Sequence, residues 1–513
     1  MFVPIKQALI SVSDKTGLEA LAQALVEANV ALVSTGGTAQ ALKVMGFRVR
    51  DVSELTHLPE MMDGRLKTLH PGVHGGLLAR RDSPDHLAAM AKHGIEAIDL
   101  LVVNLYPFEA TLAKTDDSKR LVENIDIGGP AMIRAAAKNH DFVAVVTDPA
   151  DYSQIIVAMQ QSGGTHLELR RRLAAKAFSR TAAYDALIGA WMSGGEWPDY
   201  VLDAARHTTL RYGENPQQQA ALYRRLEGSG GLARAQQLQG KELSYNNLQD
   251  ADTAFHLVQE FEAPTVAIVK HANPCGVAQG QDITAAFIAA LAGDPVSAFG
   301  GILAANRAVD AKLAEAMGSL FLEVIIAPEV TPEASEKLVT KKNLRVLIAA
   351  YEQSRSPYAD CHILPISGGY LLQTKDSAPI RKKDWKTVTK RAMTAAQQRD
   401  AEFAMMVVRS VKSNAIVLVK NGATIGIGAG QMSRVDAVRI AIEKARAHGH
   451  DPRGSVLASD AFFPFADNVA LAAEAGIAAL VQPGGSVRDA EVIAAADTEN
   501  MVMIFTGTRH FRH

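Results

Sequence analysis

TVAIVKHANPCGVA, residues 265–278, is the stretch around which this chain is organised. It begins with an apolar run, 266–269, whose β-branched residues favour a buried strand. Lys270 and His271 follow side by side where this strand ends, and a proline and a glycine close behind them predict an immediate turn. An imidazole can move a proton near neutral pH, and an ammonium group can stabilise an oxyanion or a phosphate. The pattern indicates a catalytic pair; a surface lysine beside a hydrogen-bonded structural histidine is the alternative that so short a motif leaves open.

The composition limits the class of protein. The chain has 513 residues, of which 48% are hydrophobic and 21% charged, which is typical of a globular protein with several domains. Its 53 Lys and Arg nearly balance 55 Asp and Glu, so no bulk basic field favours nucleic acid. Two cysteines, Cys275 and Cys361, exclude a disulfide framework and a Cys-rich zinc site and fit a reducing compartment. No apolar run reaches the roughly 18 residues of a membrane span, and the first residues lack a signal-peptide pattern, so we expect a cytoplasmic protein.

Residues 6–50 predict strand, helix, strand and helix in alternation, which is typical of a parallel sheet covered on both faces. Two loops, SDKTG (13–17) and STGGT (34–38), each lie between a strand end and a helix start. Ligands of such sheets bind beyond the carboxyl ends of the strands. Hydroxyls, glycines and free helix N–H groups form an anion cradle there, so two such loops indicate a phosphate site, with simple helix capping as the alternative.

Two further segments of the first half carry candidate chemistry. GRLKTLHPGVHGGLLARR (64–81) offers cations, a threonine and two histidines, but its proline and glycines argue against one helical face and so against a metal site. IDIGGPAMIRAAAKNH (125–140) predicts a helix with Pro130 as its first residue, preceded by a turn that offers backbone N–H groups at the helix N-terminus.

The second half contains a weak internal repeat. After a break at GGEWPDY (194–200), the opening stretch is echoed by NAIVLVKNGATIGIGAG (414–430), with strand, lysine, turn and small residues in the same order. DPVSAFGGILAANRAVD (294–310) is loosely echoed by LASDAFFPFADNVALAA (457–473). We interpret the repeats as a duplicated α/β domain, with chance similarity as the alternative. The aromatics beside a carboxylate in FFPFADN (462–468) suit a flat heteroaromatic ligand, or else form a corner of the core.

These motifs together resemble the family of bifunctional purine-biosynthesis enzymes that join an inosine monophosphate (IMP) cyclohydrolase to an aminoimidazole carboxamide ribonucleotide (AICAR) formyltransferase. SVSDKTG, STGGT, GRLKTLHPGVHGG, NLYPF and IDIGGPAMIRAAAKNH match its cyclohydrolase half. VKHANPCG, LRYGENP, NNLQDAD, DPVSAFGG, VKSNAIV, GAGQMSR, SDAFFPFADN and the terminal RHF match its formyltransferase half.

The resemblance implies an α/β fold in two domains. Residues 1–198 would form a methylglyoxal-synthase-like domain with a doubly wound parallel sheet, which is the cyclohydrolase. Residues 199–513 would form the formyltransferase, built from two cytidine-deaminase-like repeats at about 199–365 and 366–513. The zinc signature of true deaminases is missing, so we expect no catalytic metal.

The resemblance also implies site residues. The predicted catalytic residues are Lys270, His271 and Asn414 for formyl transfer, and Lys67, Tyr106, Asp126 and Lys138 for ring closure. Substrate and phosphate would be bound by Ser13, Lys15, Ser34, Gly36, Gly37, Thr38, Arg65, Thr68, Arg211, Tyr212 and Arg509. Folate would be bound by Arg434, Pro464, Phe465, Asp467 and Phe511.

The implied ligands are small molecules: AICAR, its formylated product, IMP, and 10-formyltetrahydrofolate as cosubstrate. The family further implies a homodimer with formyltransferase sites across the interface and a structural monovalent cation such as K+. Nucleic acid and membrane are not expected as partners. Two other function classes stay open from the residues alone: a regulatory nucleotide-binding module without turnover, and an RNA-binding protein, which the near-neutral charge disfavours. Glu323 stands where some relatives carry Asp.

Overall fold

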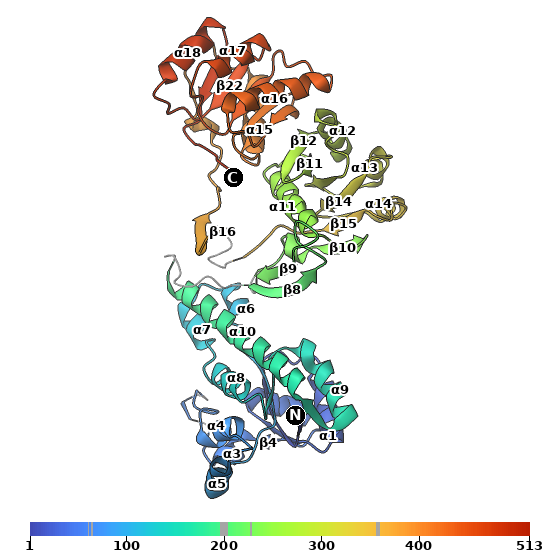
Figure 1. The fold of residues 1–513 in the computed structure, drawn as a ribbon, viewed down its shortest axis with the longest axis vertical. Coiled ribbons are helices and arrows are strands. Elements are labelled where there is room, and N and C mark those ends of the chain that lie inside the picture. The colour runs from blue at the N-terminus through green and yellow to red at the C-terminus, as the bar shows by residue number, and fades with distance from the viewer. Residues whose placement is uncertain (60, 63–64, 195–203, 226–227, 355–359) are drawn as a thin grey trace. The chain divides into compact units, whose positions relative to one another are not determined.

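The computed structural model describes residues 1–59, 61–62, 65–194, 204–225, 228–354 and 360–513 (Figure 1). They form two compact units, one containing Met1–Ala205 and the other containing most of the chain from Arg206 to His513. The predicted domain boundary at 198–199 and most of the GGEWPDY break lie outside the described residues, so that boundary stays a prediction. Among the described helices, none is long and apolar enough to span a bilayer.

Unit 1 is built on a five-stranded parallel sheet with the order β4-β3-β2-β5-β6. The strands are β2 (Gln7–Val12), β3 (Ala31–Ser34), β4 (Arg50–Asp51), β5 (Leu100–Asn104) and β6 (Ala144–Val146). A separate antiparallel pair joins β1 (Phe2–Pro4) to β7 (Gly164–His166). Strands β2, β5 and β6 are buried over nearly their whole length, as expected of a sheet covered on both faces.

Helices cover both faces of this sheet and enclose two hydrophobic cores. One core receives α1 (Leu18–Glu27), α2 (Gly36–Val44) and α9 (Tyr152–Ser162). The other receives α4 (Pro71–Leu78), α8 (Gly128–Lys138) and α10 (Leu167–Met192). The remaining helices are α3 (Val52–Thr56), α5 (Pro84–His93), α6 (Phe108–Leu112) and α7 (Ser118–Glu123). The predicted α/β class with a doubly wound parallel sheet is confirmed.

The prediction for residues 64–81 was wrong in one respect, because this segment contains helix α4. Pro71 is its first residue, a position where the missing N–H costs nothing. His70 caps the helix, its Nδ1 accepting the Gly72 N–H at 3.0 Å. The proline that argued against a helix therefore begins one. Pro130 is likewise the third residue of α8 and not the first.

Unit 2 is built on one twelve-stranded sheet with the order β10-β15-β14-β13-β11-β12-β20-β19-β21-β22-β23-β18. Its first six strands along the chain are β10 (Gln236–Gln239), β11 (Thr265–Lys270), β12 (Asn273–Gln279), β13 (Gly301–Ala305), β14 (Leu322–Ala327) and β15 (Arg345–Ile348). The other six are β18 (Lys386–Thr387), β19 (Ile416–Lys420), β20 (Ala423–Gly428), β21 (Val456–Ser459), β22 (Ala479–Gln482) and β23 (Val502–Phe505). Residues 236–348 (the first copy) and 386–505 (the second copy) have the same topology, because each places its first to sixth strands along the chain in the same order from the edge of the sheet to its centre. The two copies meet where β12 pairs with β20.

The helices repeat in the same order. The first copy carries α11 (Tyr245–Gln259), α12 (Ile283–Gly293), α13 (Ala311–Ala316) and α14 (Pro332–Leu338). The second carries α15 (Ala395–Val408), α16 (Arg434–Ala447), α17 (Asp467–Glu474) and α18 (Asp489–Thr498). Even the caps agree, because α11 and α15 each begin with a capping box, at Ser244 and at Thr394.

The two hairpins at the centre of the sheet correspond residue by residue. Lys270 pairs with Asn273 in the first, and Lys420 pairs with Ala423 in the second, each beside a register shift at the same point. A Cβ added to Gly276 or Gly426 would come within 1.9 or 2.1 Å of a carbonyl oxygen of the following helix, so both positions require glycine. The predicted echo of 265–278 in 414–430 thus matches the observed correspondence.

The second predicted echo, between 294–310 and 457–473, was out of register. Ser297 precedes β13, whereas Ser459 is the last residue of β21, the strand that corresponds to β13. The two stretches share a serine and aromatics but occupy different places in the repeat. Similar residues around a turn are therefore not enough to show that two segments occupy equivalent positions in a repeated fold.

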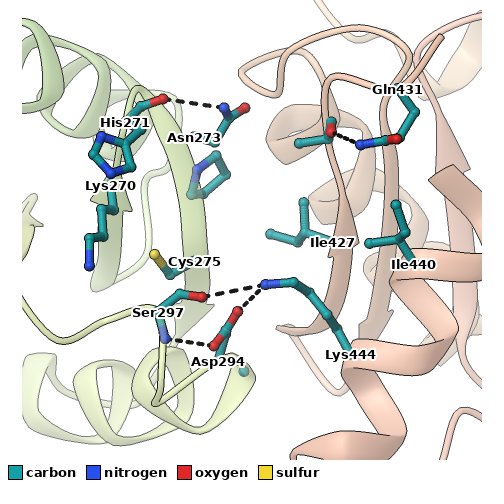
Figure 2. Close-up of a pocket in the computed structure, with 13 residues that line it drawn as sticks. Lys270, His271, Asn273, Cys275, Asp294, Ser297, Ile427, Gln431, Ile440 and Lys444 are labelled. Carbon is teal, nitrogen blue, oxygen red and sulfur yellow. Dashed lines mark hydrogen bonds and ion pairs between the residues drawn. The ribbon is translucent and has the colours of Figure 1, made fainter.

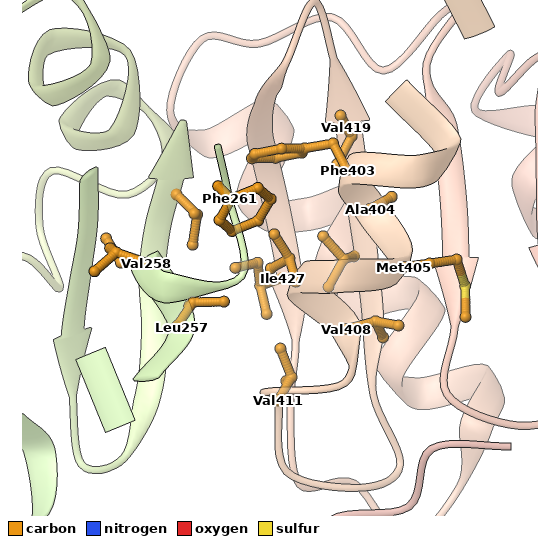
Figure 3. Close-up of a cluster of buried hydrophobic side chains, with 14 of the residues drawn as sticks. Leu257, Val258, Phe261, Phe403, Ala404, Met405, Val408, Val411, Val419 and Ile427 are labelled. Atoms are coloured by element: carbon orange, nitrogen blue, oxygen red, sulfur yellow. The ribbon is translucent and has the colours of Figure 1, made fainter. Parts of the chain in front are cut away.

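A shared core joins the two copies on the face covered by α11 and α15. Phe261 and Phe403 lie with their ring centroids 5.1 Å apart, and Figure 3 shows Leu257 and Val258 of the first copy on one side of this contact, with Met405 and Val408 of the second copy on the other. On the opposite face each copy has a core of its own. Burial of large apolar side chains between the copies makes them one body.

Two hairpins lie outside this sheet. One consists of β8 (Ala204–Leu210) and β9 (Ala220–Arg225), and the other of β16 (Cys361–Ile366) and β17 (Gly369–Thr374). Apolar side chains of the second hairpin are exposed, namely Ile363, Leu364, Ile366, Tyr370 and Leu371. The predicted division between repeats at 365–366 falls within β16 and stays a prediction.

Candidate active sites

The turn between β11 and β12 displays Lys270 and His271. His271 and the next residue have left-handed backbone angles, with φ of 53° and 56°, which a two-residue hairpin turn requires. Asp250 on α11 accepts both of their backbone N–H groups, at 3.0 and 2.7 Å. The Lys270 ammonium donates to the Phe299 carbonyl at 2.7 Å. Two anchors from different elements therefore hold the predicted catalytic pair.

Lys270 and His271 line a cavity of about 480 Å³ between the two copies (Figure 2). The first copy also contributes Asn273, Pro274, Cys275, Gly293, Asp294 and Ser297. The second copy contributes Ile427, Ala429, Gln431, Ile440 and Lys444. Burial raises the pKa of the Cys275 thiol to about 12, so this group stays protonated near neutral pH and is no thiolate nucleophile.

Asn414 of the second copy is attached to this cavity through Gln431. Its backbone N–H and its side-chain amide donate to the Gln431 carbonyl at 3.0 and 2.9 Å. Its side-chain oxygen accepts a hydrogen bond of 2.6 Å from Arg434. The structure thus brings Lys270, His271 and Asn414 to one region where the copies meet.

Arg434 lies inside the protein and not on its surface. It is 6% exposed, and its guanidinium pairs with the buried carboxylate of Asp460 and donates to the Ser459 hydroxyl at 2.8 Å. With these donors engaged, its geometry favours holding Asn414 over a direct contact with folate. Sequence reasoning missed this distinction because exposure is a tertiary property.

The other predicted folate residues are accessible. Phe465 is 49% exposed and lies under the Arg488 guanidinium, 4.9 Å from its ring centroid, whereas Phe463 two residues earlier is fully buried. In the segment FFPFADN, Phe463 is therefore part of the hydrophobic core, whereas Phe465 is exposed to solvent. Pro464 is half-buried, and Asp467 accepts the Asn468 backbone N–H at 2.7 Å.

Asn468 is a residue that sequence reasoning missed. It is 1% exposed, and its side-chain oxygen has no hydrogen-bond partner among the described residues. An amide oxygen in that condition is suited to accept from a ligand. The only signal in the sequence was its place beside Asp467.

Arg211, Tyr212, Arg509 and Phe511 lie on other segments. Arg211 stacks on the Tyr212 ring, and Arg509 stacks on the Phe511 ring, 4.7 and 4.4 Å from the ring centroids. As far as the described residues go, these four side chains do not line the cavity of Lys270. The chain terminus is nevertheless anchored beside Asn414, because Ser413 donates its N–H to the Arg512 carbonyl at 2.8 Å.

In unit 1, contacts link the carboxyl ends of β2 and β5 to the start of α8. The Ser13 hydroxyl donates to the Asn104 side chain at 2.8 Å, and the Tyr106 N–H donates to Asp126 at 3.4 Å. Asp126 also accepts the Gly129 N–H at 2.8 Å, at the first turn of α8. Asn104 had no predicted role, but its oxygen also accepts the Ser13 and Asp14 N–H groups at 2.6 and 2.9 Å and so closes the SDKTG loop.

Lys67 and Thr68 complete this edge of the sheet. A Cβ added to Gly36 would lie 3.2 Å from the Lys67 ammonium, and one added to Gly128 would lie 2.5 Å from the Thr68 hydroxyl. The STGGT loop, the segment 65–69 and the start of α8 are therefore neighbours. Lys67 also lines a cavity of about 340 Å³ with His70 and the start of α3. Lys15, Gly37 and Arg65 are exposed along the same loops, and Arg65 pairs with Glu123.

Two of the predicted phosphate hydroxyls are engaged inside the sheet. The Ser34 hydroxyl donates to the Ile10 carbonyl at 2.6 Å, and the Thr38 hydroxyl donates to the Val12 carbonyl at 2.9 Å. Both residues are buried. The loop can therefore offer an anion the backbone N–H groups of its two glycines, Gly36 and Gly37, at the N-terminus of α2.

Lys138 lies at the far end of α8. It is the last residue of a helix that starts beside Asp126, so about 15 Å of helix separates the two at 1.5 Å per residue. The described contacts do not bring Lys138 to the edge that carries Tyr106 and Asp126.

Burial raises the pKa of Asp126, although the N–H groups of Gly129 and Tyr106 oppose this by favouring the carboxylate. Burial likewise raises the pKa of Tyr184 to about 12, and its hydroxyl accepts the Asp126 backbone N–H at 2.9 Å. A carboxyl group with a raised pKa is suited to proton transfer. Among the described residues, no cluster of His, Cys, Asp and Glu could hold a metal ion.

Comparison with known families gives two matches. The model for the AICARFT/IMPCHase bienzyme matches residues 136–444, and the model for the MGS-like domain matches residues 17–131. The chain belongs to the AICARFT/IMPCHase bienzyme family. Enzymes of this family carry AICAR formyltransferase and IMP cyclohydrolase activities in purine biosynthesis, and this bienzyme is accordingly a transferase and a hydrolase.

Relatives of the bienzyme match over its full length. The "Bifunctional purine biosynthesis protein PurH" of Parvibaculum lavamentivorans is 57% identical, with 99% of this chain and 97% of the relative covered. The proteins of the same name from Cereibacter sphaeroides and Mesorhizobium japonicum are 56% and 54% identical, with 100% of this chain and 99% and 98% of the relatives covered. The predicted family, fold class and activities of the bienzyme are confirmed.

Proposed function

We propose that the bienzyme runs its two reactions at two separate sites, formyl transfer in unit 2 and ring closure in unit 1. The observation that supports the first site is the cavity where the Lys270–His271 turn of one copy faces Gln431 of the other, with Asn414 bonded to that glutamine. A second cavity between the copies is lined by the corresponding turn of the second copy, with Asn421 and Gly422, and by Gln279 of the first copy. The two turns differ in the residue proposed for catalysis, since Asn421 stands in the second turn where His271 stands in the first.

In the proposed formyl transfer, the 5-amino group of AICAR attacks the formyl carbon of 10-formyltetrahydrofolate. A C–N bond forms to the amine, and the bond between the formyl carbon and the folate nitrogen breaks. His271 takes up the proton that the amine loses, directly or through the neighbouring carboxamide. Lys270 stabilises the oxyanion on the formyl carbon and supplies the proton for the departing folate nitrogen. Asn414 holds the transferring group in line with the amine.

The nucleotide and folate contacts are proposed from the accessible groups. Arg211, Tyr212 and Arg509 would bind the nucleotide, and Pro464, Phe465, Asp467 and Phe511 would bind folate. Arg434 would act on folate through Asn414. A monovalent cation such as K+ stays a prediction of the family. The buried carboxylate of Asp460 pairs with Arg434, which also bonds Asn414, and so offers no uncompensated charge to such an ion. No step proposed here uses the ion.

In the proposed ring closure, the carboxamide nitrogen of the formylated product attacks its own formyl carbon, and water leaves. Because the reaction is intramolecular, the protein must fold the substrate and stabilise the oxyanion. Asp126, Tyr106 and Lys67 are the proposed proton-transfer groups, and the phosphate would lie among Ser13, Lys15, Gly36, Gly37, Arg65 and Thr68. Lys138 has no proposed step in ring closure, because it lies at the opposite end of α8 from Asp126.

We further propose a homodimer in the cytoplasm. The exposed apolar side chains of the β16–β17 hairpin support an interface there, because a strand pair with Ile363, Leu364, Tyr370 and Leu371 in water is costly. Light scattering after size exclusion tests this, and a monomer at micromolar concentration would contradict it.

The experiment that tests the two-site proposal is a pair of absorbance assays on wild type, His271→Ala and Asn421→Ala. Asn421→Ala is the matched control, because it changes the corresponding turn of the second copy. We expect His271→Ala to lose formyl transfer by at least ~100-fold, the usual contribution of a general base, while still converting the formylated intermediate to IMP. Asn421→Ala should retain both activities. Loss of both activities in His271→Ala, or unchanged formyl transfer in this variant, would overturn the two-site proposal.

A further inference from the structure

We propose that Lys444 and Asp294 are positioning residues for the formyl-transfer reaction: together they hold the segment whose carbonyl group fixes the catalytic lysine. This inference rests on the proposed role of Lys270. The juxtaposition that carries it is visible in Figure 2, where Lys444 of the second copy reaches Asp294 and Ser297 of the first at the floor of the cavity.

The Lys270 ammonium depends on the segment 294–300 for its position. It donates to the Phe299 carbonyl at 2.7 Å, and Phe299 lies between α12 and β13. Gly300 follows with φ of 74°, and its N–H donates to the Phe321 carbonyl at 2.8 Å. Any shift of this segment therefore moves the acceptor that orients the ammonium, and with it the group proposed to meet the developing oxyanion.

Asp294 is the anchor of that segment. It is 4% exposed, and its carboxylate accepts the Ser297 N–H at 2.8 Å while its carbonyl accepts the Ala298 N–H at 3.1 Å. A buried carboxylate must be paired to remain charged. Here Lys444 pairs with one oxygen, and His448 Nε2 lies 3.1 Å from the other.

The second copy thus clamps the end of α12 from outside. Lys444 and His448 lie in and just after the last turn of α16, and His450 Nε2 adds a contact of 2.8 Å to the Ala292 carbonyl. Burial alone would raise the pKa of Asp294, but the hydrogen bonds from Lys444 and Ser297 lower it below its ordinary value, so the carboxylate stays ionised.

The corresponding lysine of the second copy shows what this arrangement adds. The Lys420 ammonium also donates to carbonyls of the segment before the next strand, those of Asp451 and Arg453 at 3.2 and 2.9 Å. A lysine bonded to that loop is therefore part of the repeat. The ion pair between Lys444 and Asp294 joins the corresponding loop of the first copy to the second copy. It lies at the cavity of Lys270, where the position of the ammonium group affects the proposed reaction.

The test measures formyl transfer and ring closure for Lys444→Met, Lys444→Arg, Asp294→Asn and the Lys444→Met/Asp294→Asn double variant. Arg439→Met, which removes an exposed cation of the same helix, is the matched control. We expect Lys444→Met and Asp294→Asn each to lower kcat of formyl transfer by about tenfold or more, as small misplacements of reacting groups do, with both KM values within about twofold. The double variant should be no worse than the worse single one, because the two residues act as one unit. Lys444→Arg should recover most of the loss.

Ring closure in unit 1 serves as an internal check and should be unchanged in every variant. An unchanged kcat for Lys444→Met, or a Lys444→Arg variant as impaired as Lys444→Met, would overturn the inference. A raised KM with unchanged kcat would also overturn it, since Lys444 would then bind substrate itself. If Lys444→Met does not fold, Asp294→Asn carries the same test with a side chain of equal shape. A wild type without formyl transfer would overturn the proposed function as well, whereas an active wild type with an active Lys444→Met overturns this inference alone.

Discussion

The carboxylate of Asp250 holds the turn that presents His271, accepting the His271 backbone N–H at 3.0 Å and that of the next residue at 2.7 Å. Asp400 does the same in the second copy, accepting the N–H groups of Asn421 and Gly422 at 2.9 and 2.8 Å. The clamp is common to both copies, so it belongs to the scaffold. The histidine is present in one copy alone, so we assign it to the proposed formyl-transfer chemistry.

Replacing the two clamps separates these contributions. Asp250→Ala and Asp400→Ala should each lower the free energy of unfolding by about 1–3 kcal/mol, because two backbone N–H groups lose a charged acceptor. Asp250→Ala alone should also lower kcat of formyl transfer, by about 10- to 100-fold, since His271 loses its fixed position. Urea unfolding and steady-state kinetics measure the two effects. Equal kinetic losses in both variants would contradict the assignment.

The stability of unit 1 should depend on pH through Asp126. Burial raises the pKa of this carboxyl group in the folded protein, so folding takes up a proton between the ordinary and the raised pKa. The free energy of unfolding contributed by Asp126 therefore falls as pH rises through that window. Asp126→Asn should unfold at a higher temperature than wild type at neutral pH, and it should lose ring closure while keeping formyl transfer. Calorimetry between about pH 3 and 7 measures the first effect.

Asp148→Asn is the control with the opposite sign. Burial would raise the pKa of Asp148, but the Lys176 hydrogen bond lowers it. Its stabilising contribution is present above the ordinary pKa and is lost as pH falls through the lowered one. Asp148→Asn should therefore be less stable than wild type at neutral pH and should converge with it in acid. The same pH dependence in both variants would show that these carboxyls do not govern it.

Cys275 should resist alkylation despite lining the cavity of Lys270. Its pKa of about 12 leaves almost no thiolate, so iodoacetamide at about pH 8 should modify it slowly in the folded protein and rapidly in urea. Cys275→Ala should retain formyl transfer. Rapid modification of the folded protein, followed by mass spectrometry, would show that the thiol is less buried than its surroundings indicate.

The contact between Phe261 and Phe403 should make the two copies of unit 2 unfold together. Phe403→Ala should cost about 3–5 kcal/mol, as truncation of a buried aromatic does. Formyl transfer should then be inactivated at a lower temperature while ring closure is unaffected. Val487→Ala, at a fully exposed position, is the control. Loss of both activities at one temperature would contradict an effect of this contact on unit 2 alone.

Much of the site could be predicted from local pattern. The apolar run before Lys270 and the turn after it placed the pair at a strand end, and the repeated strand and lysine at 414–430 revealed the duplication. These features are local because a strand, a turn and their φ angles depend on a few neighbouring residues. The helix at Pro71 was missed for the same kind of reason, since a proline reads as a breaker unless the N-terminus of the helix is already known.

Local pattern could not predict which polar side chains already have hydrogen-bond partners inside the protein and which are available to a ligand. Ser34, Thr38 and Arg434 have the residue types of ligand-binding groups, yet the structure uses their donors inside the sheet or in the pair with Asp460. The distance of Lys138 from Asp126 likewise follows from the helix between them. Whether a polar group is available depends on which buried acceptors lie within about 3 Å, and those belong to strands far away in the chain.

The sequence by itself determined the family, the two α/β halves, the duplicated hairpin and the Lys270–His271 pair, because these rest on apolar periodicity and on residues adjacent along the chain. Only the tertiary structure decided that the cavity of Lys270 is composite, that Asn414 joins it through Gln431, and that Lys444 reaches Asp294 across more than a hundred residues. The physical reason is that β12 and β20 pair at the centre of one sheet. This pairing brings the ends of two helices together, and it creates an electrostatic contact that neither copy encodes alone.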